Sequence, residues 1–152
     1  DESGTLKMIT DDKWFCFVIE QLLSNALKYT RAGTISIFFS QPKVLCLKDT
    51  GIGIAPQDLP RIFEKGYTGC NGRTDKKASG LGLYLCKRIC KNLGIGISIT
   101  SEVDNGTCVY LSLDQYPLKA KIFISYTTVS FGAENVSQFN GNAFSVLLYY
   151  AL

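Results

Sequence analysis

Hydrophobic and polar positions alternate along this chain with two different periods, and each period predicts one kind of element. Between Trp14 and Ala26 the apolar residues recur at helical spacing, which predicts a helix with one packed face. From Thr34 to Phe39 the alternation of β-branched and aromatic residues predicts a strand. The expected elements, in chain order, are a strand at 5–10, a helix at about 11–29, strands at 34–39 and 44–48, a short helix at 56–63, a helix at 80–93, and strands at 95–100 and 107–113.

Capping and turn residues support these boundaries. Gly94 is well placed to end the last helix, and an Asn-Gly pair at 105–106 predicts a hairpin between the last two strands. Pro56 is tolerated in the first turn of the short helix. The apolar side of the last helix is expected to be the stripe Leu81, Leu85, Ile89 and Leu93. This order of elements predicts an α+β fold, a two-layer α/β sandwich with a mixed sheet and its helices on one face.

Two stretches fall outside this regular pattern. Residues 66–79 are polar and rich in glycine and include Arg73, Lys76 and Lys77, so we expect a mobile lid. Residues 115–152 are rich in aromatic and β-branched residues, and strands are possible at 121–131 and 143–150. We therefore divide the chain into one domain at 1–114 and a C-terminal extension at 115–152. The role of the extension is unknown, and it is interpreted either as extra strands or as a sequence of artificial origin.

Composition narrows the class of protein. The 152 residues suffice for one domain with a sizeable core, and 46% hydrophobic against 19% charged residues excludes a disordered chain. A net charge of +3 is too small to indicate nucleic acid as a partner. No apolar run approaches the roughly 18 residues of a membrane span, and the first residues do not resemble a signal peptide. If the parent protein is a membrane receptor, its spans lie outside this sequence.

The six cysteines do not indicate a metal site. They form no Cys-x-x-Cys pair, and the chain contains no histidine, so zinc-site spacing is absent. Five of them lie among apolar residues, where cysteine usually acts as a small buried hydrophobe, whereas Cys70 lies in the glycine-rich stretch and is expected to be more exposed. We therefore expect reduced thiols and a cytoplasmic setting.

The first helix carries polar residues of suitable chemistry for a nucleotide. Gln21, Asn25 and Tyr29 are four residues apart and share a face, and Lys28 lies beside Asn25. An amide oxygen is a suitable ligand for Mg²⁺, an ammonium group can contact phosphate, and a tyrosine ring can lie against adenine. The simpler interpretation is an amphipathic helix with a polar edge.

A carboxylate and two glycines follow the second of the expected strands. Asp49 precedes Gly51 and Gly53, directly after an apolar run. The carboxylate can accept a hydrogen bond from the exocyclic amine of adenine, and the glycines let the backbone approach a flat ligand. A tight turn after a buried strand is the alternative.

The segment Gly80-Leu81-Gly82 opens the last helix. Helix N-termini present free N–H groups that bind phosphate, and glycine allows a close approach. The segment is not a Walker loop, because no Gly-Lys-Ser/Thr follows, and it is not a dinucleotide fingerprint, because no strand precedes it.

Four blocks in this order resemble the motifs of one family. The segments 25–30, 49–54, 61–69 and 78–85 resemble the N box, the first glycine box, the F box and the second glycine box of sensor histidine kinases. The resemblance covers about residues 6–113 and implies the ATP-binding fold shared with type II topoisomerases, heat-shock chaperones and mismatch-repair ATPases. The lid sequence and the segment after it look like the membrane-sensor kinases of Gram-positive bacteria that answer envelope stress or peptide antibiotics.

The resemblance also implies roles for single residues. Asn25 would coordinate Mg²⁺, Lys28 would contact phosphate, and Tyr29 would lie beside adenine. Asp49 would accept from the adenine amine, and Phe63 would anchor the base of the lid. The remaining positions implied to bind ATP are Gly51, Gly53, Ile54, Lys65, Thr68, Gly69, Gly80, Leu81, Gly82, Leu83 and Thr107.

Gln21 departs from the pattern of the ATPase relatives, which carry a water-activating glutamate at that position. An amide cannot act as a general base, and Glu20 is one residue out of register. This departure argues against ATP hydrolysis and favours phosphoryl transfer from Mg-ATP to an external acceptor. The predicted catalytic residues are Gln21, Asn25 and Lys28. The alternatives are an ATPase module of the chaperone type, and a nucleotide-binding or anti-sigma-type serine kinase domain.

The partners implied by the resemblance lie outside this sequence. They are a histidine-bearing dimerisation domain of the same parent protein and a response regulator downstream. The parent would be a membrane-anchored homodimer that exposes this domain to the cytoplasm. Because the 152 residues include no histidine, we expect no autophosphorylation by this chain alone.

Overall fold

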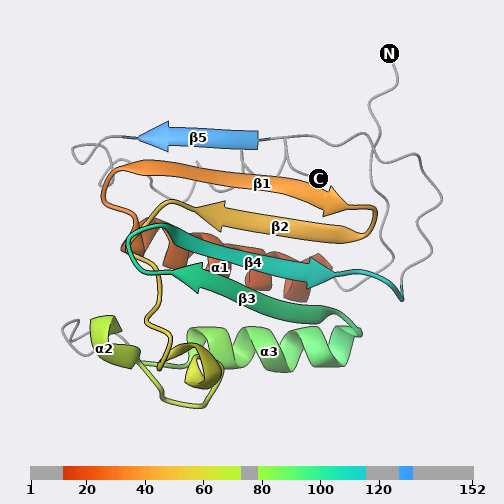
Figure 1. Cartoon of the computed structure of the whole chain (residues 1–152). Helices are drawn as coiled ribbons and strands as arrows, with labels where there is room; N and C mark the ends of the chain where they lie inside the picture. The colour runs from red at the N-terminus through yellow and green to blue at the C-terminus, as the bar shows by residue number, and fades with distance from the viewer. Residues whose placement is uncertain (1–11, 73–78, 116–126, 132–152) are drawn as a thin grey trace.

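The computed structural model describes residues 12–72, 79–115 and 127–131. Two helices, α1 (Asp12–Tyr29) and α3 (Gly82–Leu93), cover one face of a sheet (Figure 1). The short elements η1 (Leu59–Arg61) and α2 (Gly69–Gly72) lie between the second strand and α3. The strands are β1 (Gly33–Gln41), β2 (Val44–Asp49), β3 (Gly96–Glu102), β4 (Gly106–Ser112) and β5 (Thr127–Phe131). The prediction of a two-layer α+β fold is confirmed.

The sheet has the strand order β3-β4-β2-β1-β5, and all four pairings in the described part of the chain are antiparallel. The expectation of a mixed sheet is therefore wrong for these strands. The connection through α3 does bring β3 back in the same direction as β2. However, β4 lies between them and pairs with both, so the two parallel strands never meet. The strand β5 falls within the range 121–131 and forms an edge beside β1.

The core lies between the sheet and the two helices. On α1, Val18, Leu22 and Leu23 are at most 2% exposed. Leu47 of β2 stands opposite Ile37 of β1 on one side and Val109 of β4 on the other, so inward side chains of three strands form one apolar surface. Fully burying an aliphatic side chain of this size contributes about 1.5–3 kcal/mol, so this apolar face is a main source of the stability of the fold.

The buried side of α3 differs from the stripe that the sequence predicted. Cys86 and Cys90 are fully buried, whereas Leu81 and Leu85 remain 38% and 39% exposed. Ile89 and Leu93 do pack against the core, together with Leu83. The helix is turned so that its cysteine side meets α1, because small side chains allow two helices to approach closely. Gly94 ends the helix as predicted, in the left-handed conformation with φ 69°.

The short helix expected at 56–63 is also wrong in extent. Only the 3₁₀ turn Leu59–Arg61 forms there. Pro60 lacks the N–H that an α-helix would need at that position, so the helix cannot propagate. Within the lid predicted as a loop at 66–79, the structure contains the short helix α2, and residues 73–78 with Arg73, Lys76 and Lys77 lie outside the described residues. The strands expected at 5–10 and 143–150 also lie outside them.

Cys46 and Cys108 form a disulfide between β2 and β4, contrary to the expectation of reduced thiols. Cys46 stands opposite Tyr110 and Cys108 stands opposite Lys48, so the two cysteines are diagonal neighbours on one face of the sheet. Their sequence separation of 62 residues gave no sign of this contact. The other four cysteines, all within the described residues, take part in no disulfide, and Cys70 among them is exposed as predicted. In the described part of the chain, no helix has the length and apolarity that a membrane crossing requires.

Candidate functional site

Three predicted motifs lie at one end of the molecule, where α1 and β2 end and α3 begins (left in Figure 1). The amide of Ile52 donates to the carbonyl of Tyr29 over 3.0 Å, which joins the turn after β2 to the end of α1. At the start of α3, a Cβ atom added to Gly82 would lie 3.0 Å from Oε1 of Gln21. The fold therefore brings the polar face of α1, the glycine turn and the N-terminus of α3 together.

Asp49 is the buried acceptor of this site. Its side chain is 7% exposed, and Oδ1 accepts a 2.8 Å hydrogen bond from the amide of Gly51. Burial raises the pKa of Asp49 above its ordinary value, while hydrogen bonds from the amides of Gly51 and Thr107 and the hydroxyl of Thr30 oppose the rise. A carboxylate held in this way can accept from an amine that enters the pocket.

The glycines of the turn are required by the chain itself as well as by any ligand. Gly53 has φ +70°, and a Cβ atom there would lie 2.1 Å from the carbonyl oxygen of Glu102. A Cβ atom at Gly51 would lie 2.3 Å from the carbonyl oxygen of Tyr29. The sequence suggested that these glycines leave room for a base, but the room on the Cβ side of each is taken by protein backbone. Their first role is to let the turn pack between α1 and β3.

The polar residues of α1 differ in how far they are exposed. Gln21, Asn25 and Tyr29 are half-buried, and Lys28 is exposed. The ammonium of Lys28 lies 5.1 Å from the centre of the Tyr29 ring. Among the described residues no group of three or more His, Cys, Asp or Glu side chains is placed to hold a metal ion. A metal at Asn25 would therefore depend on ligand oxygens and water, which suits Mg²⁺.

Comparison with known proteins decides the family. The sequence model of the histidine kinase-, DNA gyrase B-, and HSP90-like ATPases matches residues 10–117. The chain belongs to this ATPase family.

Its curated relatives are sensor proteins. The chain is 44% identical over 108 residues to the sensor protein BceS of Halalkalibacterium halodurans, a match that covers 69% of this chain and 32% of BceS. It is 42% identical over 112 residues to the sensor histidine kinase GraS of Staphylococcus epidermidis, which covers 72% of this chain and 32% of GraS. The chain thus spans about a third of the length of the curated relatives that it matches.

Solved structures agree on the fold. One is full-length ShkA in complex with AMPPNP, with a TM-score of 0.62 and 23% identity over 78% of this chain and 25% of that one. Another is the mycobacterial sensor histidine kinase MprB, with a TM-score of 0.56 and 22% identity over 66% of this chain and 70% of that one. At this level of identity the likeness shows the ATPase fold alone.

The two ends of the lid of this ATPase domain meet. The amide of Gly66 donates to the carbonyl of Gly80 over 3.0 Å. Gly80 has φ +68°, and a Cβ atom there would lie 2.4 Å from the carbonyl carbon of Gly66, so glycine is required at this contact. Ser79 adds a 3.3 Å hydrogen bond from the amide of Leu81 to its hydroxyl. The second glycine box thus brings the two ends of the predicted lid together as well as opening α3.

Asp58 is a site residue that the sequence interpretation missed. This carboxylate is 6% exposed, and it accepts hydrogen bonds from the hydroxyl of Tyr67 at 2.5 Å and from the amide of Cys70 at 3.1 Å. These bonds fix the segment with Thr68 and Gly69 to the turn before it. The bond to Asp58 is also the main reason why the pKa of Tyr67 is raised. An acidic residue between Gln57 and Leu59 is expected at the surface, so nothing in the local sequence pattern indicated that Asp58 is buried.

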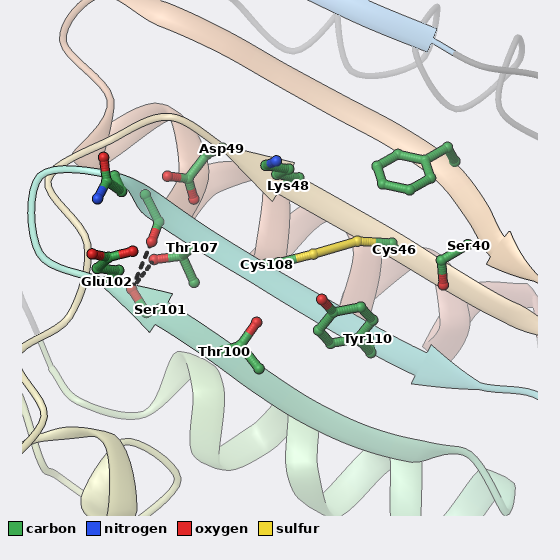
Figure 2. A pocket seen from close by; sticks show the side chains of 13 residues that line it. Ser40, Cys46, Lys48, Asp49, Thr100, Ser101, Glu102, Thr107, Cys108 and Tyr110 are labelled. Carbon is green, nitrogen blue, oxygen red and sulfur yellow. Dashed lines mark hydrogen bonds between the residues drawn. A yellow bond between two sulfur atoms is a disulfide. The ribbon is translucent and has the colours of Figure 1, made fainter.

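Ser101 is a second residue that was missed. Its hydroxyl accepts from the amide of Ile54 at 2.8 Å, donates to the carbonyl of Gly106 at 2.8 Å and lies 2.9 Å from Oγ1 of Thr107 (Figure 2). It links the first glycine box to the predicted adenine-side threonine. Ser101 stands opposite Thr107 in the β3–β4 pairing, so the hairpin register would have identified it.

The F-box phenylalanine lies against α3. The Lys87 ammonium is 4.9 Å from the centre of the half-buried Phe63 ring. Phe63 therefore joins the segment before the lid to the helix after it, in line with the anchor role implied for it. Lys65 is exposed nearby in sequence, as a lid cation would be.

A hollow of about 540 Å³ lies on the other face of the sheet, away from the helices (Figure 2). It contains the Cys46–Cys108 disulfide together with outward side chains such as Lys48, Thr100 and Tyr110. Asp49 and Thr107 reach one end of it, but no residue of α1 or α3 lines it. The hollow is therefore not the place where the motifs of the ATPase family meet.

Proposed function

We propose that this chain is the catalytic ATP-binding domain of a two-component sensor histidine kinase. It binds Mg-ATP and donates the γ-phosphoryl group to a histidine on a separate dimerisation domain. The observation that carries the proposal is the position of Asp49. A buried carboxylate beside a glycine turn is held within the same end of the fold as the polar face of α1 and the first turn of α3.

The residues present fit this ligand. Asp49 accepts from the adenine amine, and the half-buried ring of Tyr29 lies beside the base. The free N–H groups at the start of α3 face the phosphates, to which Lys28 contributes a positive charge. Lys65, Thr68 and Gly69 supply the lid side, and Gly80 to Leu83 supply the hinge side. Ile54 and Thr107 close the base pocket.

Mg²⁺ fits at Asn25. This ion keeps several waters and binds through few protein groups, so a single amide oxygen on a half-buried helix face is sufficient. When bound, the ion neutralises charge that develops during phosphoryl transfer. Gln21 lies close to the first turn of α3, where it can position a group by hydrogen bonding but cannot remove a proton.

The relatives support the kinase over the alternatives. Several are named sensor kinases, and the glutamine at position 21 removes the base that an ATPase of this family would use. Because the chain lacks histidine, the acceptor belongs to another domain of the parent protein. The names of the same relatives, as sensor kinases, support a response regulator as the next partner. The resemblance of the motifs motivates the rest of the proposal, namely a membrane-anchored, dimeric parent that exposes this domain to the cytoplasm and a signal of the envelope-stress or peptide-antibiotic type.

A phosphotransfer assay tests the proposal. The chain is mixed with a separately produced histidine-bearing dimerisation domain and ATP labelled at the γ-phosphate. Label on histidine is the expected result, whereas free phosphate alone supports the ATPase and label on serine supports the serine kinase. The chain alone should turn over ATP very slowly.

The metal assignment has its own test. Asn25→Ala should abolish the gain in ATP affinity that Mg²⁺ provides, and the unfolding temperature should change little because the residue is off the packed face. Asn92→Ala is the matched control, since Asn92 is exposed on α3. Calorimetric titrations with and without Mg²⁺ measure both variants. An unchanged Mg²⁺ effect in the Asn25 variant would remove Asn25 from the ligand set.

A further inference from the structure

Thr30 is the first residue after α1, and it lies beneath the proposed adenine pocket. Its side chain is 0% exposed. A Cβ atom added to Gly51 would lie 2.7 Å from Oγ1 of Thr30 and 2.9 Å from Oδ1 of Asp49, so both oxygens approach the same point. The preceding carbonyl, of Tyr29, accepts the amide of Ile52, which fixes the backbone of this corner.

The hydroxyl of Thr30 has no well-formed hydrogen bond within the described residues, although it lies close enough to help lower the pKa of Asp49. Buried hydroxyl groups in folded proteins are almost always hydrogen-bonded, so an exception needs an explanation. A valine would have nearly the same shape, yet the position holds a polar group. A hydroxyl proton rotates freely about the C–O bond, so this donor can turn to whichever acceptor becomes available.

We propose that Thr30 is a positioning residue for nucleotide recognition, whose hydroxyl holds the Asp49 carboxylate in the orientation that receives the adenine amine. The inference rests on the proposed function, because it requires adenine in this pocket. The amides of Gly51 and Thr107 already donate to the Asp49 carboxylate, and the hydroxyl of Thr30 is the side-chain donor beside them. Each donor helps to keep the carboxylate ionised and correctly turned once water has been expelled. Thr30 provides its donor from below the site, without contacting the ligand.

The charged groups around Asp49 do not provide the same support. Lys28 and Arg31 near the end of α1, Lys48 on β2 and Glu102 on β3 are all exposed. None of them is among the causes that shift the pKa of Asp49, which are burial and hydrogen bonds. Within the described residues the ionisation of this carboxylate is therefore set by burial first and by neutral donors that oppose it, and Thr30 is the donor that a conservative substitution can remove.

Thr30→Val tests the proposal in the whole 152-residue chain, because it keeps the shape and removes the hydroxyl. Since that hydroxyl makes no well-formed hydrogen bond without ligand, the variant should unfold at the same temperature as the wild type or higher. Its dissociation constant for ATP should rise about tenfold, as expected when a hydrogen bond to a charged group is lost. The loss of ATP binding on acidification should begin at a higher pH, because Asp49 would accept a proton more readily.

Two further variants make the result specific. Thr30→Ser keeps the hydroxyl and should restore both the affinity and the pH profile. Thr100→Val makes the same substitution on an exposed position of β3 and should change neither. Unaltered ATP affinity and an unaltered pH profile in Thr30→Val would overturn the inference. An equal loss of ATP affinity in Thr30→Val and Thr30→Ser, accompanied by lower stability of both variants, would also overturn it, because that result indicates a role in packing. Failure of the wild type to bind ATP would instead overturn the proposed function, and with it this inference.

Discussion

The hydroxyl of Tyr67 donates a 2.5 Å hydrogen bond to Oδ1 of Asp58, while Oδ2 of the same carboxylate accepts from the amide of Cys70. The guanidinium of Arg61 lies 4.3 Å from the centre of the Tyr67 ring and pairs with Glu64 at 3.1 Å. The first turn of the lid is thus held by one buried carboxylate. This attachment fixes the start of the predicted lid to the turn before it.

The first prediction concerns this attachment. Asp58→Ala removes both acceptors and should increase hydrogen exchange at the amide of Cys70 by at least tenfold. It should also lower stability by about 1–3 kcal/mol, because two partly buried donors lose their partner. ATP affinity should fall as well, since the lid would have to be ordered on binding. Exchange measured residue by residue, together with thermal unfolding, gives both numbers.

Tyr67→Phe is the matched variant, because it removes only the hydroxyl bond. The amide of Cys70 should then keep its protection, and the stability change should be smaller than for Asp58→Ala. Equal exchange at Cys70 in the wild type and the Asp58 variant would show that the carboxylate does not hold the lid.

The second prediction concerns the conflict between binding and stability at Asp49. Burial raises its pKa above 3.8, so the folded chain holds the proton more tightly than the unfolded chain does. The stability that this group contributes is therefore complete below the unfolded pKa and is lost as the pH rises through the folded pKa. At pH 7 the neutral variant Asp49→Asn should unfold at an equal or slightly higher temperature, although its amide can present a donor where adenine needs an acceptor.

The same variant should bind ATP about tenfold or more weakly, because a charge-assisted hydrogen bond is lost. Asp114→Asn, at an exposed position after β4, should change neither property. Calorimetry with ATP and GTP and thermal unfolding at pH 7 measure both effects. Full ATP affinity in a folded Asp49→Asn protein would be incompatible with its role as the adenine acceptor.

Local patterns predicted most of the fold, and their failures have physical reasons. The helical period of α1, the run before Asp49 and the Asn-Gly hairpin each depend on neighbouring residues, which a sequence displays directly. The rotation of α3 about its axis, by contrast, depends on where α1 lies. That is why the exposed Leu81 and Leu85 were predicted to be buried, and why the cysteine side of the helix was missed.

The candidate site shows the same division. Asp49, Gly51 and Asn25 belong to contiguous motifs, so their residue types and spacing were enough to propose them as candidate site residues. Asp58, Ser101 and Thr30 act through partners distant in the chain, and the Cys46–Cys108 disulfide joins residues that only the β2–β4 register makes neighbours. Contacts of this kind are visible only once the sheet order is known.

The third prediction uses two glycines that differ in their surroundings. Gly53 and Gly66 both have positive φ, but a Cβ atom at Gly53 would clash with the Glu102 carbonyl, whereas one at Gly66 would have nothing within 4 Å. Gly66→Ala should therefore cost only the strain of the left-handed conformation, about 1–2 kcal/mol. Gly53→Ala should cost clearly more, because β3 must move. Similar losses in urea unfolding of the two variants would show that the clash is relieved without cost.

The last prediction concerns the cysteines. The disulfide does not include Cys16, Cys70, Cys86 and Cys90, which remain thiols. Burial raises the pKa of Cys86 to about 12 and that of Cys90 to about 11, and the thiolate is the reactive form. At pH 8 a maleimide should therefore react first at the exposed Cys70 and very slowly at the two buried cysteines of α3.

Unfolding the wild type should then raise the count to four reactive thiols without reductant and to six with reductant. The unfolded Cys46→Ala variant should give five reactive thiols without reductant, because Cys108 is released from the disulfide. Reduction removes a cross-link that spans 62 residues, so stability should fall by up to about 4 kcal/mol. In Cys46→Ala a reductant should produce no further loss, which separates the effect of this bond from general effects of the reagent. Six reactive thiols in the unfolded, unreduced wild type would show that β2 and β4 are held by backbone pairing and packing alone.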